Sequence, residues 1–320
     1  MTRIEVGAAK LRRLIRAHDP TWLKRAREQT KALETGIPAT EFPSIWNEIK
    51  DVYIRLQGGE RGSKCAYCEK WIEAARIEHD VEHFRPKTKV SRWKVPDHLL
   101  REFHAAGVQV NQPAEESEPG YRLLAYHVLN YAAACKQCNS VLKRDLFPIT
   151  GKRLSNAKDP ARLKSEGALL IYPIDHVDTD PEDLIEFQGI SPRAKAAAGL
   201  DRLRALVTIE IFQLDDWRSR KSLIYDRLEW VEKLWLALKQ RDRGESPNDV
   251  HDANQTIVRV ISIGFRHANC LRSFHRLYER SPGEAEGFYK VAMKYLQSYS
   301  SGKGPSSTEP IGAPRRMSDR

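Results

Sequence analysis

The sequence has no long run of apolar residues, and none lies near its beginning. Its 320 residues are 41% hydrophobic, which is enough to build a core. Without a long apolar run the chain has no candidate for a membrane-spanning helix. The opening residues Met1–Gly7 also lack the apolar stretch of a secretory signal. We therefore expect a cytoplasmic protein with no membrane partner.

Cysteine is scarce and odd in number. Four of the five cysteines form two Cys-x-x-Cys pairs, Cys65 with Cys68 and Cys135 with Cys138. In a cytosolic chain this pattern indicates metal binding and argues against a disulfide framework. The remaining thiol, Cys270, lies in an apolar-leaning segment and is expected to be a buried small hydrophobic residue.

The two pairs together predict one structural zinc ion. Zn²⁺ takes four thiolates in a tetrahedron, and two Cys-x-x-Cys turns supply four. A long stretch of chain separates the pairs, so the metal would cross-link two distant segments and hold the residues between them in register. The alternatives are two unrelated thiol motifs or a redox Cys-x-x-Cys, which would titrate freely and bind no zinc.

Charge is weakly biased toward the positive. The formal net charge is +10, from 53 Lys and Arg against 43 Asp and Glu. This excess permits a polyanionic partner but does not establish one. Residues 8–34 are expected to be helical, and nine Lys and Arg face three Asp and Glu between residues 3 and 31. Such a segment is either a solvated helical face, the commoner case, or an arm that contacts phosphates.

Apolar spacing and Gly/Pro positions predict the remaining elements. A second helix over 41–56 should end at Gly58-Gly59, and 105–120 should form an inserted surface loop. A short strand is expected over 169–173.

The chain beyond residue 200 should be helical. Apolar residues spaced 4-3-4-3 predict a seam on one helix face, for the core of this chain or for docking a partner: Ile224, Leu228, Val231, Trp235 and Leu238. Ser281–Glu284 is a capping box that starts a helix at Pro282. The Ser-, Gly- and Pro-rich residues 299–320 should be disordered.

Acidic and histidine residues alternate between the two cysteine pairs. Residues 77–83 are expected to form a strand that stops before Pro86, with Asp80 and Glu82 on one face and His79 and His83 on the other. A histidine beside an acid, within a zinc-clamped loop, is a candidate general base. Phosphodiester hydrolysis also needs a divalent cation, and oxygens of Glu82 and Asn139 would suit Mg²⁺.

The second cysteine pair lies in a segment whose composition favours helix. Ala132–Ala134 and Leu142 are helix formers, and Asn130 would cap the helix at its N-terminus. Cys135, Cys138 and Asn139 would then project within about one turn of each other, so one helix would carry both zinc ligands and a ligand of the catalytic metal.

Three segments together resemble the HNH endonucleases, which have the ββα-metal fold. They are Cys65-Ala-Tyr-Cys-Glu69, Val81-Glu-His-Phe-Arg-Pro-Lys87 and Asn130-Tyr-Ala-Ala-Ala-Cys-Lys-Gln-Cys-Asn-Ser140. The motif Glu-His-Phe-Arg-Pro-Lys, together with Phe147-Pro148 and Leu170–Asp175, resembles the HNH nuclease subunit (PtuB) of Septu-type anti-phage systems. Relatives of that subunit accompany some retrons. The resemblance covers about residues 60–175.

The resemblance implies a role for each matching residue. His83 stands where the general base stands, Glu82 is the acidic metal ligand, Asn130 is the asparagine that orients the histidine strand, and Asn139 replaces the final histidine as a metal ligand. The catalytic ion would be Mg²⁺ or Mn²⁺. Arg85 and Lys143 could contact the substrate phosphate, Asp80 could support the metal ligands, and His79 is treated as structural. A long insertion around 88–120 leaves the second strand of the ββα unit hard to place.

The expected fold is α+β, mainly helical, with a small zinc-stapled ββα module. We expect four segments: an N-terminal helical segment (1–59), the nuclease module (60–175), a C-terminal helical region (176–298) and a disordered tail (299–320). The implied function is DNA cleavage together with an ABC/SMC-like ATPase of the PtuA type. The alternatives are a stand-alone restriction or mobile-element HNH nuclease, a non-catalytic zinc-stapled nucleic-acid-binding module, and the redox protein considered above.

Overall fold

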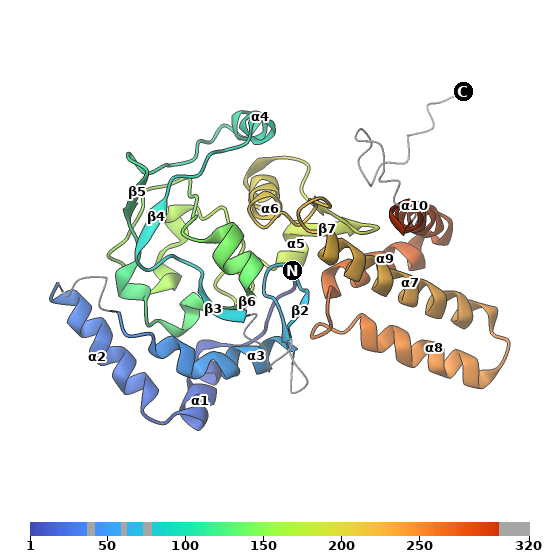
Figure 1. Cartoon of the computed structure of the whole chain (residues 1–320), viewed down its shortest axis with the longest axis horizontal. Helices are drawn as coiled ribbons and strands as arrows, with labels where there is room; N and C mark the ends of the chain where they lie inside the picture. The colour runs from blue at the N-terminus through green and yellow to red at the C-terminus, as the bar shows by residue number, and fades with distance from the viewer. Residues whose placement is uncertain (37–41, 59–62, 73–78, 301–320) are drawn as a thin grey trace. The chain divides into compact units, whose positions relative to one another are not determined.

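The computed structural model describes residues 1–36, 42–58, 63–72 and 79–300, and these divide into two compact units (Figure 1). The first unit contains Met1–Leu184 and Ala194–Phe212. The second contains Ile185–Arg193 and the described residues from Gln213 onward. Helices combine with short antiparallel strand pairs, so the chain is α+β and mainly helical, as predicted. No helix in the described part is long and apolar enough to cross a membrane.

Helices dominate the beginning of the first unit. Its α-helices and the longer 3₁₀-helix preceding α3 are α1 (Ala8–His18), α2 (Trp22–Glu34), η2 (Ile45–Ile49), α3 (Lys50–Gly58), α4 (Asp97–Ala105), α5 (Pro181–Leu184) and α6 (Gly199–Ile211). The shorter helical turns are η3 (Arg122–Leu124), η4 (Val128–Asn130), η6 (Pro160–Arg162) and η7 (Lys164–Glu166). A π-helix, η5, spans Gln137–Lys143.

The strands of the first unit form three antiparallel pairs within its described residues. They are β1 (Ser63–Lys64) with β2 (Trp71–Ile72), β3 (His79–His83) with β6 (Tyr131–Cys135), and β4 (Lys89–Ser91) with β5 (Ser117–Pro119). The β3–β6 pair lies at the centre of the unit, since the apolar side chains of β6 are buried. This pair carries most of the residues singled out from the sequence.

The N-terminal helical prediction is confirmed with two adjustments. Asp19 ends α1, and its carboxylate accepts hydrogen bonds from the backbone N–H of Thr21 and Trp22, which starts α2. The second predicted helix begins as η2 and continues as α3, although residue 41 lies outside the described residues. α3 ends at Gly58, where a Cβ atom would lie 2.7 Å from Ser63 Cα, so only glycine fits this close approach.

The predicted helix over the second cysteine pair is wrong in its first half. Tyr131–Cys135 form a strand, in register with β3 from His79↔Cys135 to His83↔Tyr131. Alanine favours helix only weakly, and the fully buried Ala132–Ala134 are small enough to pack between β3 and its neighbours. β6 is therefore a strand that the sequence did not predict, and η5 follows it.

Two further predictions are corrected. Residues 169–173 form no strand: the chain there is buried and irregular, with isolated bridges at Ala168 and Ile174. The predicted surface loop 105–120 contains β5, which pairs with β4 at its far end.

The second unit is a helical bundle with one strand pair. Its elements are β7 (Ile185–Gln188), β8 (Ser191–Ala194), α7 (Lys221–Arg243), α8 (Pro247–Val260), α9 (Ala268–Arg280) and α10 (Pro282–Ser300). Every residue of the predicted seam on α7 is at most 7% exposed, and Trp235 packs against Phe274, Tyr278 and Tyr289 of the same unit. The seam therefore belongs to the core, and the interpretation of these side chains as a docking surface is wrong.

The remaining C-terminal predictions have mixed outcomes. α10 starts at Pro282 as predicted, and Cys270 is fully buried as predicted. The helix includes residues 299 and 300, which were expected to be disordered, while residues 301–320 lie outside the described part. The four-segment division stays a prediction, although residues 1–59 and 60–175 share one compact unit.

Candidate functional site

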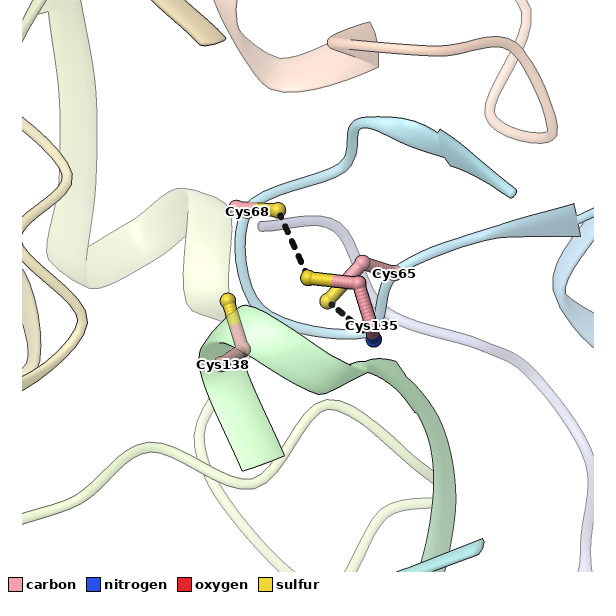
Figure 2. Close-up of side chains that lie close together, drawn as sticks. All are labelled: Cys65, Cys68, Cys135 and Cys138. Carbon is pink, nitrogen blue, oxygen red and sulfur yellow. Dashed lines mark hydrogen bonds between the residues drawn. The ribbon is translucent and has the colours of Figure 1, made fainter. Parts of the chain in front are cut away.

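The four paired cysteines converge on one point of the first unit (Figure 2). The Sγ atoms of Cys65, Cys68, Cys135 and Cys138 all lie within 4.8 Å of one another, and the Cys68 and Cys135 sulfurs are 3.8 Å apart. Tetrahedral zinc with Zn–S bonds of about 2.3 Å requires sulfurs about 3.8 Å apart. The cluster can therefore hold a structural metal ion such as zinc, as the spacing predicted.

A tight turn prepares the first cysteine pair. The Cys65 N–H donates to Lys70 O at 2.9 Å, and the Glu69 N–H donates to Cys65 O at 3.0 Å. Glu69 closes the turn with φ +58°. Its carboxylate is buried and lies 2.8 Å from Lys64 Nζ; this cation and the N-terminal amine hold the carboxyl pKa far below its usual range despite the burial.

The second pair bridges a strand end and a helix start. Cys135 is the last residue of β6, and Cys138 lies in the first turn of η5. The Cys135 N–H donates to Cys65 Sγ at 3.4 Å, a contact that stabilises a thiolate (Figure 2). The Ala66 N–H donates to Ala133 O at 3.0 Å and docks the first turn on β6. The cluster thus fixes the turn, β6 and η5 against one another.

A cleft of about 460 Å³ lies on the β3–β6–η5 unit. It is lined by residues of β3 and of η5, by Trp46 and Asn47 of η2, and by the segments that follow β3 and η5. The polar side chains that meet there include Asp80, Glu82, His83 and Asn139. The structure therefore brings together the predicted base and both predicted metal ligands.

His83 is held as a neutral imidazole. Its Nε2 lies 3.0 Å from the carbonyl oxygen of Ala125, which can only accept, so Nε2 carries the proton. Edge-on contacts with the rings of Trp46 and Tyr131 at 4.8 and 5.0 Å fix the ring plane. Burial lowers the pKa of His83 well below its ordinary value, with a further contribution from Lys87.

The other ring nitrogen of His83 is available. In the tautomer set by Ala125, Nδ1 carries the lone pair, and no hydrogen-bond partner for it exists among the residues that the structure describes. His83 lines the cleft. The ring therefore has the protonation state that a general base needs at neutral pH.

Glu82 is buried beside a lysine. Its Oε1 atom lies 2.5 Å from Lys143 Nζ, so the two buried side chains form an ion pair. Burial raises the pKa of the Glu82 carboxyl, and Lys143 only partly opposes this effect. A divalent cation that binds this carboxylate therefore has to compete with Lys143 for it.

Asn130 braces the segment that leaves β3. Its Oδ1 accepts from the Arg85 N–H at 2.8 Å, and its Nδ2 donates to the carbonyls of Arg85 and Leu124 at 3.0 and 3.2 Å. Its backbone oxygen accepts from the Phe84 N–H at 2.9 Å. The fully buried Asn130 is not the predicted helix cap. Its hydrogen bonds position the segment that follows His83.

Asn139 and Asp80 contact each other across the cleft wall. Asn139 Nδ2 donates to Asp80 Oδ2 at 3.3 Å, and Ser140 Oγ donates to the same oxygen at 3.4 Å. Since the amide nitrogen faces Asp80, the Asn139 carbonyl oxygen is the atom left for a cation. Asp80 therefore supports a predicted ligand. Nothing is described for the side chain of His79.

Arg85 and Lys143 do not face the cleft as phosphate contacts would. Arg85 is 5% exposed, and its Nε lies 3.2 Å from Glu166 Oε2 among the rings of Phe84, Tyr121 and Phe147. Lys143 is fully buried and donates to His83 O at 3.1 Å. In this geometry both lysine and arginine serve the internal packing of the site.

Two other cations line the cleft and were missed. Lys87 Nζ lies 4.5 Å from the Trp46 ring centroid, and burial lowers the pKa of this amine. Arg144 is exposed, in a left-handed conformation (φ +49°) just after η5. Arg144 directly follows Lys143, and Lys87 lies two residues after Arg85. In each pair one cation is buried and the other lines the cleft, and only the fold shows which is which.

No protein-family model matches this chain, and neither the curated proteins nor the solved structures compared with it include a match. The resemblance to HNH endonucleases therefore rests on the three sequence segments.

Proposed function

We propose that this chain is a metal-dependent HNH endonuclease that hydrolyses phosphodiester bonds in DNA. One observation carries the proposal: a neutral histidine with an available Nδ1, a buried carboxylate and an asparagine share one cleft on a strand–strand–helix unit. Phosphodiester hydrolysis needs a base and an oxygen-rich cation site side by side, and the described cleft supplies residues of both types.

The chain's own residues would divide the work as follows. His83 would accept the proton of the attacking water at Nδ1, while the carbonyl of Ala125 holds the protonated Nε2 in place. Asn130 would keep the strand exit rigid. Glu82 and Asn139 offer oxygens for Mg²⁺ or Mn²⁺, which when bound supplies charge neutralisation at the phosphate and the leaving oxygen.

Substrate phosphate would contact Lys87 and Arg144. These are the cations on the cleft wall, whereas Arg85 and Lys143 are buried in ion pairs. Lys87 carries no ion pair among the described residues, so its charge is free to meet a phosphate. Burial lowers the pKa of this amine, and a bound phosphate would oppose that shift because an adjacent anion favours the charged form.

The resemblance of residues 60–175 extends the proposal to a Septu-type anti-phage system. In that setting the chain is the nuclease subunit and acts with an ABC/SMC-like ATPase. The buried seam of α7 does not supply the docking surface for that partner, which leaves the surface to be found. A stand-alone restriction or mobile-element nuclease would carry the same site and lack the neighbouring ATPase gene.

One observation favours a second candidate, a non-catalytic zinc-stapled nucleic-acid-binding module. Lys143 already occupies the position next to Glu82 that a catalytic cation would need. The nuclease needs a metal ion that competes with Lys143 for this oxygen, whereas the binding module needs no such ion.

The test is plasmid nicking by the purified zinc-loaded chain with Mg²⁺ or Mn²⁺ added or omitted; omission, unlike chelation, leaves the zinc in place. We expect metal-dependent nicking that falls by 10²- to 10⁴-fold in His83→Ala, the usual contribution of a general base. His104→Ala, an exposed histidine of α4, is the matched control and should cut like the wild type.

The outcomes separate the candidates. Nicking that persists in His83→Ala would contradict the assigned base. A wild-type chain that is inactive alone is assayed again with the product of the neighbouring ATPase gene. Absence of cleavage there too, with DNA binding retained, identifies the binding module.

A further inference from the structure

The charged side chains of helix α1 are all basic. Its eleven residues include Lys10, Arg12, Arg13 and Arg16, and no acidic residue. At about 100° per residue these four side chains cover an arc of about 160°. The buried Leu11 and Ile15 lie on the opposite side of the helix. One continuous face of α1 is therefore basic.

The charges on this face are not neutralised within the unit. All four side chains are exposed, and none forms an ion pair with any residue that the structure describes. The neighbouring helix α2 is different, since Arg25 bridges Asp19 and Glu48, and Lys24 pairs with Glu28. Four adjacent cations repel each other, so an external polyanion is their natural partner.

The amphipathic pattern of α1 is already used by the fold. Leu11 and Ile15 are 0% exposed, because α1 packs against η4 and against α2 and α3, which lie beside it in Figure 1. A basic amphipathic helix that inserts into a membrane surface needs its apolar side free. The apolar side of α1 is buried, which excludes insertion of this helix into a membrane surface.

The basic helix is tied to the wall of the cleft. His18, the last residue of α1, places Nε2 2.8 Å from the carbonyl oxygen of Glu48 in η2. Trp46 and Asn47 of the same short helix line the cleft. The C-terminal end of α1 therefore lies against the short helix that borders the cleft.

We propose that the exposed face of α1 binds the sugar-phosphate backbone of duplex DNA and tracks it next to the cleft. The proposal rests on the proposed function for the identity of the polyanion. An eleven-residue helix is about 16 Å long, and a duplex presents about one negative charge per 1.7 Å of its axis, so each cation of α1 can meet its own phosphate. The contacts carry no sequence information.

The test measures binding of a 30-base-pair mixed-sequence duplex over a series of salt concentrations, without Mg²⁺ so that nothing is cut. The variant Arg12→Ala/Arg13→Ala/Arg16→Ala should bind more weakly at low salt. Its plot of log affinity against log salt should be shallower by about 0.9 for each phosphate that the variant no longer neutralises. The control Arg243→Ala/Arg259→Ala/Arg280→Ala removes the same charge from exposed positions of the second unit and should keep the wild-type slope.

An unchanged affinity and slope in the α1 variant would overturn the inference, as would a wild-type chain that binds no duplex. Poly-glutamate binding is measured in parallel. If the α1 variant loses only poly-glutamate, the face binds an acidic protein instead. Loss of duplex binding in a chain that never cuts DNA would keep this inference and reject the nuclease, whereas cutting with full duplex binding by the α1 variant would do the reverse.

Discussion

At the scale of single residues, burial lowers the pKa of two histidines of the first unit, His83 and His127. His83 lies among aromatic rings, and His127 accepts a hydrogen bond at Nδ1 from the Leu129 N–H at 3.2 Å. Burial lowers the pKa of His127 to about 4, with Asp159 opposing and Arg12 adding to the shift. Protonation of the buried His127 ring is therefore coupled to unfolding, so acid should destabilise the fold.

His127 should make the fold acid-sensitive. In the unfolded chain its pKa returns to about 6.5, so between pH 6.5 and 4 the unfolded state binds more protons. The contribution of the neutral His127 ring to the free energy of unfolding is fully present above pH 6.5, and it falls by up to about 3 kcal/mol as the pH drops to 4. The variant His127→Asn keeps an acceptor for the Leu129 N–H but has no group that titrates in this range. We expect its free energy of unfolding, measured with urea, to fall less between pH 7 and 4.5 than that of the wild type.

His104→Ala serves as the control because His104 is exposed, and it should retain the full pH dependence. An acid response of His127→Asn equal to that of the wild type would show that this ring is not the group responsible.

The sequence predicted those residues whose role depends on local spacing. The two Cys-x-x-Cys pairs form their turns within four residues, and Glu82 and His83 are neighbours on one strand, so both were found. The surroundings of Arg85 depend on Glu166, 81 positions later, and those of Lys143 depend on His83, 60 positions earlier, and on the adjacent Glu82. No local pattern reveals such partners, which is why the buried cations were taken for phosphate contacts and Lys87 was passed over.

At the scale of elements, the centre of the site depends on a strand that its own residues disfavour. β6 is rich in alanine and was predicted as helix, yet its partner β3 and the side chain of Gln57 fix it as a strand. Gln57 on α3 donates to the carbonyls of Lys64 and Ala133 at 2.8 Å, and accepts from the Ala133 N–H at 2.8 Å. One buried amide thus ties α3, β1 and β6 together.

Gln57→Leu should therefore be strongly destabilising. The change leaves the Ala133 N–H and the Lys64 carbonyl buried without this partner, at a cost of about 2–4 kcal/mol. Denaturant unfolding measures the loss. Gln109→Leu, at an exposed position of the same unit, is the control and should change the free energy of unfolding by less than about 0.5 kcal/mol. Equal stabilities of the two variants would contradict the bridging role of Gln57.

At the scale of the whole molecule, the cysteine cluster belongs to one of two compact units. All four sulfurs lie in the first unit, whereas α7, α8 and α9 form the core of the second from their own apolar side chains. Metal removal should therefore act unevenly along the chain.

We expect one zinc ion per chain, and a zinc-selective chelator should remove several kcal/mol of stability from the first unit, because metal binding and folding are coupled at such sites. Hydrogen exchange measured by mass spectrometry should show lower protection in α3, β3 and β6, and unchanged protection in α7 and α9. A calcium-selective chelator is the control. A uniform decrease of protection in both units would contradict the assignment of the metal to the first.

The long separation of β3 from β6 has a consequence for the order in which the protein is made. During synthesis Cys65, Cys68, Glu82 and His83 leave the ribosome well before Asn130, Cys135 and Asn139. Until the later segment emerges, the early half has two of the four clustered cysteines and a strand without its partner. Under the proposed function, the nascent chain would therefore carry no complete nuclease site until η5 has been made.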